Sequence, residues 1–293
     1  MEIYKSQQYL DKTISVELIT IESIQQINAC DIIKGILLGY GMYSRVYKGR
    51  WNDQDIVIKE IKEIKGKPKL TRKLFQNEVN ILSQCYGSPY IPQLLTTIID
   101  STNMWIIMEL CTGGDLFDYT PLIVHPAEIQ ALFADTAKGL AWLHNRRIVH
   151  RDVKPENILL HQKTNTCRTR ALLGDMGMAS ELSNSGFLYD ICGTLIYSAP
   201  EMINEEPYNE KVDVYSFGLS AIRVYERRKW VVPKWASDCS STNPIDRPNL
   251  NIFEIQSMCK DGTACKRGRC CWFVHPVLTS TTKSTDIDFS ITV

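Results

Sequence analysis

Three polar side chains lie at fixed spacing in a short loop that is flanked by apolar residues. They are Asp152, Lys154 and Asn157, within the run HRDVKPENILL that begins at His150. A carboxylate can hold and deprotonate an attacking hydroxyl, an ammonium can offset charge on a moving phosphoryl group, and a carboxamide oxygen can bind Mg²⁺. This set predicts phosphoryl transfer, with Asp152 and Lys154 as catalytic residues and Asn157 as a metal ligand. The alternative is a polar loop between two strands.

The same run resembles the catalytic loop of eukaryotic protein kinases, which has the pattern H-R-D-x-K-x-x-N. Asp175 follows Asn157 by eighteen residues, and it lies in the run GDMG, which resembles the D-F-G motif of that family with methionine in place of phenylalanine. The resemblance implies that Asn157 and Asp175 together hold Mg²⁺. It also implies that Met176, which is large and apolar, packs where the aromatic ring would lie.

A loop with two glycines and a lysine further upstream resemble the nucleotide-binding end of the same site. The loop is the run GYGMYSRV that begins at Gly39, and Lys59 ends the apolar run IVIK. Glycines let backbone N–H groups approach phosphates, although two glycines at this spacing also fit an ordinary hairpin turn. The resemblance implies that Lys59 holds the α- and β-phosphates and that Glu78 pairs with it. A solvated glutamate is the alternative for Glu78.

Further nucleotide contacts are expected by the same resemblance, at the glycine loop and at the connection between lobes. Asp115 could touch the ribose or cap the helix that begins near Leu116. Val57 stands where the family usually has alanine, and this adds bulk near the adenine. The residues expected to contact the nucleotide are Leu38, Gly39, Gly41, Val46, Lys59, Glu78, Glu109, Cys111 and Asp115.

The residues after Asp175 resemble the serine/threonine and tyrosine-kinase-like branches of the family. The run GTLIYSAPE, residues 193–201, resembles the pattern G-T-x-x-Y-x-A-P-E. The resemblance implies that Thr194 bonds toward Asp152 and Lys154. It also implies a structural ion pair between Glu201 and Arg247, and hydrogen bonds from the catalytic-loop backbone to Asp213.

Two departures from the family pattern predict local properties of this chain. Many relatives carry a phosphorylated threonine four residues before the threonine of the Gly-Thr pair, and this chain has Asp190 there. We hypothesise that Asp190 pairs with Arg151 and partly orders the loop without phosphorylation; an ordinary exposed aspartate is the alternative. Residues 226–242, which are basic and contain tryptophan, replace a substrate-docking helix with a short connection in this interpretation.

Apolar periodicity predicts the elements that must position these groups. Short apolar runs from about Lys34 to Asp100 indicate strands, interrupted by one helix over residues 69–84. Helical periodicity follows from Pro126 onward, over 212–225, and again near Pro248. A sheet-rich part followed by a helix-rich part predicts an α+β protein of two lobes, the bilobal kinase fold. We expect an extension over 1–33, a kinase domain over 34–258, a zinc finger over 259–276 and a flexible tail over 277–293.

Bulk composition limits the location and partners of the chain. Lys and Arg number 33 and so do Asp and Glu, so any nucleic-acid contact must come from a local patch. The first residues lack the apolar core of a signal peptide, and no run of about 18 apolar residues could span a membrane. Six of the ten cysteines are scattered. We expect these to be reduced thiols in a cytoplasmic, or alternatively nuclear, protein.

The other four cysteines gather near the end of the chain. Cys259, Cys265, Cys271 and His275 have the spacing C-x5-C-x5-C-x3-H, which resembles CCCH zinc fingers. Three thiolates and an imidazole are a sufficient tetrahedral set for Zn²⁺. Cys270 is an alternative to Cys271, and a disulfide or free thiols are the alternatives to zinc. Nearby lysines, arginines and aromatic rings fit single-stranded RNA, and a structural or protein-binding finger fits equally well.

These observations lead to one expected function and two alternatives. We expect ATP- and Mg²⁺-dependent phosphorylation of Ser or Thr in protein substrates, with a Zn²⁺-binding finger for RNA or a partner. A weakly nucleotide-binding scaffold is one alternative, and an RNA-binding protein with an attached kinase domain is the other. The physiological substrate and the oligomeric state do not follow from the sequence.

Overall fold

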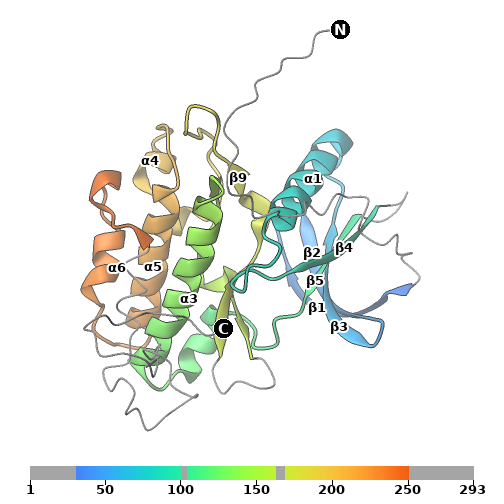
Figure 1. Ribbon diagram of the computed structural model, residues 1–293, viewed down its shortest axis with the longest axis horizontal. Coiled ribbons are helices and arrows are strands. Elements are labelled where there is room, and N and C mark those ends of the chain that lie inside the picture. Colours follow the sequence, from blue (N-terminus) through green and yellow to red (C-terminus); the bar gives the residue numbers. More distant parts are fainter. Residues whose placement is uncertain (1–30, 100–103, 163–168, 251–293) are drawn as a thin grey trace, which may run out of the picture.

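The computed structural model describes residues 31–99, 104–162 and 169–250 (Figure 1). Most of the expected extension over 1–33 lies outside these residues, as do the expected zinc finger, the tail and most of the helix near Pro248. Within the described ranges, no helix is long and apolar enough to cross a membrane.

A five-stranded antiparallel sheet and one long helix form the smaller lobe. The strand order is β1-β2-β3-β5-β4, and α1 lies across one face of the sheet (Figure 1). The strands and the helix expected from the apolar runs are confirmed. Their bounds are β1 Ile33–Tyr40, β2 Ser44–Trp51, β3 Gln54–Ile61, α1 Pro68–Gln84, β4 Leu94–Ile99 and β5 Met104–Glu109.

Helices dominate the larger lobe, with two short strand pairs at its junction with the sheet (Figure 1). Pro126 begins α3, as its fixed φ angle predicts for a first helical turn. The α-helices and strands of this lobe are α2 Leu116–Tyr119, α3 Pro126–His144, β6 Ile148–Val149, β7 Ile158–His161, β8 Arg170–Leu173, β9 Ser180–Glu181, α4 Pro200–Ile203, α5 Lys211–Arg227 and α6 Lys234–Cys239. The 3₁₀ turns are η3 Thr120–Leu122, η4 Pro155–Asn157, η5 Met176–Met178, η6 Leu195–Tyr197 and η7 Pro244–Asp246.

One hydrophobic core runs from α1 into the helical lobe. Phe75 of α1 and Met176 of η5 belong to the same cluster of buried side chains as Phe133 and Phe217. Met176 is 1% exposed, so a methionine does fill the packing position expected for it. A separate cluster covers the other face of the sheet, and it includes Ile56 and Ile58. The two-lobed α+β arrangement expected from the sequence is therefore confirmed.

Residues 226–242 differ from the expectation of a bare connection. They contain the six-residue helix α6, whose Trp235 is 8% exposed. The Trp235 ring lies 5.9 Å from Phe133 of α3 and 5.7 Å from Phe217 of α5, measured between ring centroids. Burial of a large aromatic surface against two helices explains why this short segment becomes ordered.

The packing of α6 on α5 predicts a steric requirement at Gly218. A Cβ atom there would lie 2.7 Å from the carbonyl oxygen of Ala236 and 2.8 Å from the backbone nitrogen of Ser240. We expect Gly218→Ala to lower the free energy of unfolding by about 2 kcal/mol, because backbone atoms cannot rotate away and this outweighs the helix propensity of alanine. Thermal or urea unfolding measures the change.

Gly39→Ala is the matched control, because no atom lies within 4 Å of the added Cβ. Equal unfolding midpoints for the two variants would contradict the close contact between α5 and α6.

Candidate active site

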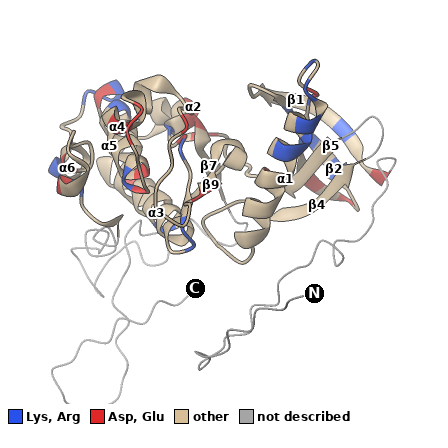
Figure 2. Ribbon diagram, turned by 90° about the horizontal axis from the view of Figure 1, so that it is seen from above, with Lys and Arg blue, Asp and Glu red and all other residues tan. Residues whose placement is uncertain are grey.

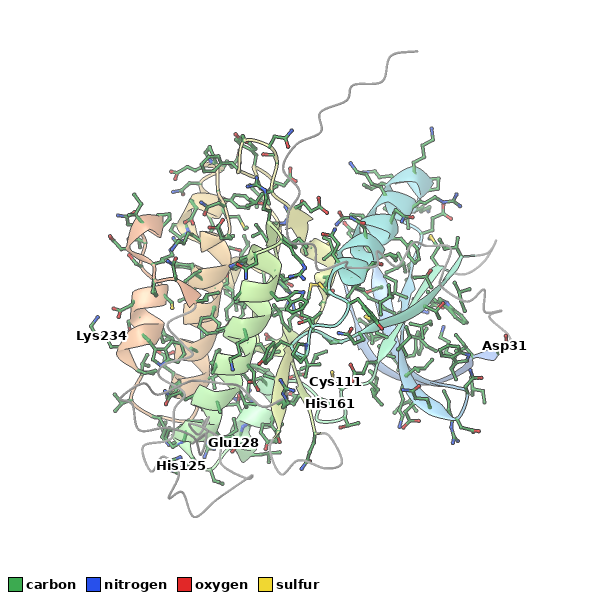
Figure 3. The ribbon with its side chains drawn as sticks, viewed as in Figure 1. Asp31, Cys111, His125, Glu128, His161 and Lys234 are labelled. Carbon is green, nitrogen blue, oxygen red and sulfur yellow. The ribbon has the colours of Figure 1, made fainter. Side chains whose placement is uncertain are left out.

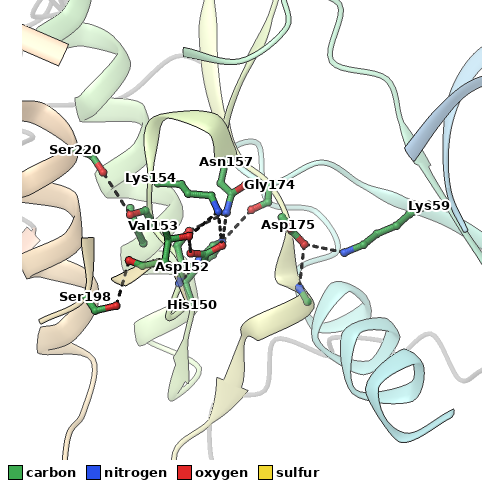
Figure 4. Close-up of polar contacts among 12 residues, drawn as sticks. Lys59, His150, Asp152, Val153, Lys154, Asn157, Gly174, Asp175, Ser198 and Ser220 are labelled. Atoms are coloured by element: carbon green, nitrogen blue, oxygen red, sulfur yellow. Dashed lines mark hydrogen bonds and ion pairs between the residues drawn. The ribbon is translucent and has the colours of Figure 1, made fainter. Parts of the chain in front are cut away.

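Lys59 connects two carboxylates that come from distant parts of the chain. Its Nζ atom lies 2.5 Å from Oε1 of Glu78 and 2.7 Å from Oδ1 of Asp175; Figure 4 shows the second contact. In β3 the side chains alternate, so Ile56 and Ile58 pack on the outer face while Lys59 faces α1. Glu78 is only 4% exposed. The predicted pairing of Lys59 with Glu78 is confirmed, and the solvated alternative is wrong.

Burial and charge act in opposite directions on the pKa values of this cluster. Burial alone would lower the pKa of Lys59, but the negative charges of Glu78 and Asp175 outweigh burial and raise that pKa. The positive charge of Lys59 in turn lowers the pKa of Asp175 to about 2, against the opposing effect of burial. At neutral pH the cluster therefore holds one ammonium ion and an ionised carboxylate at Asp175.

Asp175 has a backbone conformation that aims its side chain at Lys59. Its φ angle is 56°, in the left-handed region that few non-glycine residues adopt. The Oδ1 atom accepts hydrogen bonds from Lys59 and from the backbone nitrogen of Gly177, at 2.7 and 3.3 Å. The amide of Asn77 in α1 also donates to the carbonyl oxygen of Ala179, at 2.9 Å. These contacts tie α1 to the segment after β8.

The loop between β6 and β7 brings the predicted catalytic residues together (Figure 4). Oδ2 of Asp152 accepts from Nζ of Lys154 at 2.9 Å and from Nδ2 of Asn157 at 3.1 Å. Oδ1 of Asp152 accepts from the hydroxyl of Thr194 at 2.7 Å, and that hydroxyl accepts from Lys154 at 2.8 Å. The predicted bonding of Thr194 toward Asp152 and Lys154 is confirmed.

Asp213, in the first turn of α5, supports the catalytic loop from beneath. Its carboxylate accepts hydrogen bonds from the backbone nitrogens of His150 and Arg151, both at 2.8 Å, as predicted. Nε2 of His144 lies 2.8 Å from the same carboxylate. Arg151 has a φ angle of 66°, so these bonds offset the cost of a left-handed turn just before Asp152. No local pattern in the sequence indicates this role of His144.

The hairpin of β7 and β8 places the two predicted magnesium ligands side by side. Asn157 comes directly before β7, Asp175 follows β8 by two residues, and Gly174 N donates to Asn157 O at 2.8 Å. The Asn157 amide nitrogen bonds to Asp152, which leaves its carbonyl oxygen for a cation. Two oxygen donors fit Mg²⁺, which takes its other ligands from phosphates and water.

His150 links this hairpin to the catalytic loop. Its Nε2 atom lies 2.9 Å from the carbonyl oxygen of Gly174, directly before Asp175 (Figure 4). The His150 side chain is fully buried. It therefore couples the position of Asp152 to that of Asp175 through a contact that the sequence analysis did not assign.

The predicted nucleotide contacts at the glycine loop lie together in the β1–β2 hairpin. Gly39 pairs with Val46 across the two strands, and Gly41 N donates to the carbonyl oxygen of Ser44 at 3.0 Å. Leu38 is half exposed. The segment is thus a hairpin turn, as one alternative held, and its exposed backbone also suits the approach of phosphates.

The connection between the lobes holds the remaining predicted contacts (Figure 3). The backbone nitrogen of Glu109 donates to the carbonyl oxygen of Gln93 at 3.0 Å, so this N–H is not free for a nucleotide. Cys111 is half-buried, and burial together with the charge of Glu109 raises the pKa of its thiol to about 12. Asp115 accepts from Asp118 N at 2.8 Å. This confirms the capping alternative for Asp115.

Glu201 and Arg247 form the buried structural pair expected from the sequence. The Nη1 and Nη2 atoms of Arg247 donate to the two carboxylate oxygens of Glu201 at 2.5 and 2.8 Å. Arg247 also donates to the carbonyl oxygens of Ser241, Lys211 and Thr242. The bidentate pair together with these carbonyl acceptors explains how an arginine that is 2% exposed can remain buried.

Arg151 makes two hydrogen bonds that were not predicted, to Met178 and to Tyr208. Asp190 does approach Arg151, but at 3.7 Å and with 83% of its side chain exposed, so the pair contributes little. Stronger contacts run from Arg151 to the carbonyl oxygen of Met178 at 2.7 Å and to the hydroxyl of Tyr208 at 3.2 Å. That hydroxyl donates to the carbonyl oxygen of Asp190 at 2.6 Å. Tyr208 therefore links Arg151 of the catalytic loop to the segment that contains Asp190.

The predicted zinc ligands lie outside the described residues. Within the ranges that the structure describes, no three His, Cys, Asp or Glu side chains are grouped to hold a metal. Of the scattered cysteines, Cys85, Cys111, Cys192 and Cys239 lie within the described ranges and form no disulfide there.

Comparisons with known proteins identify the relatives of this chain. A family profile described as Protein kinase domain matches residues 33–259. The chain is 30% identical over 246 residues to the serine/threonine-protein kinase pakF of Dictyostelium discoideum, across 79% of this chain and 20% of that protein. It is 31% identical over 210 residues to pakG of the same organism, across 70% and 17%. The chain thus spans about a fifth of the length of these two relatives.

The bridge made by Tyr208 predicts local stability of the segment from Leu182 to Gly193. We expect Tyr208→Phe to speed chymotrypsin cleavage in this segment by about fivefold, because loss of the hydroxyl removes two hydrogen bonds, about 1 kcal/mol in net terms. Limited proteolysis with mass spectrometry measures the rate. Tyr189→Phe is the control, since Tyr189 is 59% exposed. Wild-type cleavage rates in Tyr208→Phe would show that the bridge does not hold the segment.

Proposed function

This chain belongs to the protein kinase family, and we propose that it transfers the γ-phosphoryl group of ATP to Ser or Thr hydroxyls of proteins. The observation that carries the proposal is the contact of Lys59 with both Glu78 and Asp175. The curated relatives described above are named serine/threonine kinases. Lys154, together with the Gly-Thr pair, supports the serine/threonine specificity and the tyrosine-kinase-like branch.

Each group of the cluster has a distinct part in the proposed reaction. Asp152 holds the acceptor hydroxyl and accepts its proton, and Lys154 offsets negative charge on the phosphoryl group as it moves. Lys59, oriented by Glu78, holds the phosphates. When bound between Asn157 and Asp175, Mg²⁺ would neutralise phosphate charge. Acceleration comes from positioning and electrostatics in a preformed network, because the protein forms no covalent bond to the phosphoryl group.

A scaffold that binds nucleotide only weakly is the second candidate, and one observation favours it. Val57 pairs with Met108 across β3 and β5 and shares the face of Lys59, so its branched side chain adds bulk on the side expected to hold adenine. The complete set of polar groups at Asp152, Lys154 and Asn157 argues for catalysis, since a scaffold has no need of them.

Phosphorylation of a generic protein acceptor tests the two candidates. We expect purified protein with ATP and Mg²⁺ to label the acceptor, and Asp152→Ala to lower the rate by about 10³-fold because the proton acceptor is lost. Asp246→Asn, at an exposed aspartate of η7, should retain the wild-type rate. Phosphatase-treated protein should also stay active, since Tyr208 and Asp190 contact Arg151 without a phosphate. Equal labelling by wild type and Asp152→Ala would leave the scaffold as the function.

We propose further that Cys259, Cys265, Cys271 and His275 bind Zn²⁺ in a finger that contacts single-stranded RNA or a protein partner. The C-x5-C-x5-C-x3-H spacing supports this. Zinc binding by thiolates requires a reducing compartment, so the proposal includes a cytoplasmic or nuclear location.

Metal analysis of the purified full chain tests the finger. We expect stoichiometric zinc in the wild type and its loss in Cys265→Ser, because a thiolate ligand is removed. Cys192→Ser, at a free thiol in the kinase domain, should retain the metal. Comparing Cys270→Ser with Cys271→Ser identifies the third thiolate. A metal-free wild-type chain would refute the zinc site.

A further inference from the structure

A run of cations begins at the end of β3 and continues into α1. We call residues 62–73 the basic segment; its cations are Lys62, Lys65, Lys67, Lys69, Arg72 and Lys73, and its one acidic residue is Glu63. All these cations except Lys62 are exposed. Within the part of the chain that the structure describes, none of them forms an ion pair. Because the whole chain has no net charge, this is a local concentration of positive charge.

The basic segment is held in one conformation by Thr71. The backbone nitrogen of Ile64 donates to the Thr71 hydroxyl at 2.9 Å, and this hydroxyl donates to the carbonyl oxygen of Lys67 at 3.1 Å. Lys67 N also donates to the carbonyl oxygen of Ile64 at 2.7 Å, closing a turn through Gly66 at a φ angle of +74°. Thr71 is fully buried. The lysines on the turn are therefore presented from an ordered backbone, which lowers the entropy lost on binding.

The cations at the start of α1 share one face of that helix. Lys69, Arg72 and Lys73 are spaced three and four residues apart, so their side chains leave the helix on the same side. The first turn of α1 contains no acidic residue, so the partial positive charge of the helix end adds to theirs. In Figure 2 the Lys and Arg colour is concentrated on part of α1 in the sheet lobe.

A hairpin that carries two exposed tyrosines adjoins the start of the basic segment. The backbone nitrogen of Lys62 donates to the carbonyl oxygen of Tyr43 at 2.8 Å, which places the segment beside the β1–β2 hairpin. Tyr43 is 42% exposed and Tyr40 is 74% exposed. Rings that can stack with bases, adjacent to cations that can bind phosphates, are the combination found in proteins that bind single strands without sequence preference.

We infer that the basic segment binds the phosphate backbone of a single-stranded nucleic acid, with bases stacking on Tyr40 and Tyr43. Acidic peptides would use the cations but not the rings, and duplexes hide the faces of their bases. The inference concerns the kinase domain and does not require the proposed finger or phosphoryl transfer. The supporting observations are the positive charge of the segment, its hydrogen-bonded backbone and the exposed tyrosines of the adjoining hairpin.

Binding of the full chain to a labelled oligouridine about 20 nucleotides long tests the inference, with no ATP present. We expect affinity to fall with salt with a log–log slope of about −0.7 per phosphate contact. Lys65→Glu combined with Lys69→Glu should weaken binding by at least about tenfold at low salt and make the slope shallower, because two contacts are lost. The thermal midpoint should stay unchanged, since both side chains are exposed.

Lys229→Glu combined with Lys234→Glu is the matched control, because it changes the net charge equally at exposed lysines of the other lobe. This control should bind oligouridine like the wild type. Equal weakening by both double variants would mean a diffuse charge effect and would overturn the inference. Full binding by the Lys65/Lys69 variant would assign the RNA contact to another part of the chain. Binding of the wild type to phosphatidylserine vesicles but not to oligouridine would identify a membrane surface instead.

Discussion

The buried ammonium of Lys59 is the interaction on which the rest of this site depends. It joins β3, α1 and the segment after β8 at a single point, through carboxylates at 2.5 and 2.7 Å. An unpaired charge at this depth would cost several kcal/mol. The sheet, the helix and the helical lobe are therefore held in a mutual arrangement in which both carboxylates can reach the lysine. Any motion of α1 that separates Glu78 from Lys59 also disturbs the group expected to hold the phosphates.

A second network holds the catalytic loop, and it consists of hydrogen bonds from the loop backbone to a buried carboxylate. The left-handed turn at Arg151 is intrinsically unfavourable, and the buried carboxylate of Asp213 offsets it by accepting from two consecutive backbone nitrogens. His150 then reaches the carbonyl oxygen of Gly174. The two networks thus meet at the β7–β8 hairpin, where Asn157 directly precedes β7 and Asp175 follows β8. A backbone hydrogen bond between Gly174 and Asn157 helps to fix the positions of these two predicted metal ligands.

Helix α1 lies across one face of the sheet, and its own two faces differ in character. Its buried face places Glu78 and Phe75 in the interior, while its outer face and the turn before it present exposed cations. Thr71 belongs to both, since its buried hydroxyl closes the turn that carries the lysines. A polyanion bound to the outer face would therefore contact the same helix that orients Lys59 through Glu78. Helix α1 is a rigid connection between the basic segment and Glu78.

The sequence alone determined the chemistry of the site and the type of most elements. Asp152, Lys154 and Asn157 lie close together in the chain, so their spacing reveals them, and apolar periodicity located the strands and the long helices. Where the sequence left two alternative roles for a residue, its partners in the tertiary structure decided between them. Glu78 became buried because α1 turns it toward β3, and Asp115 became a helix cap. No local pattern in the sequence indicated the roles of Tyr208 and His144. Their hydrogen-bond partners, Arg151 and Asp213, are each about 60 residues away in the chain. Long-range contacts depend on how the helices and strands pack, and the local spacing of residues does not predict that packing.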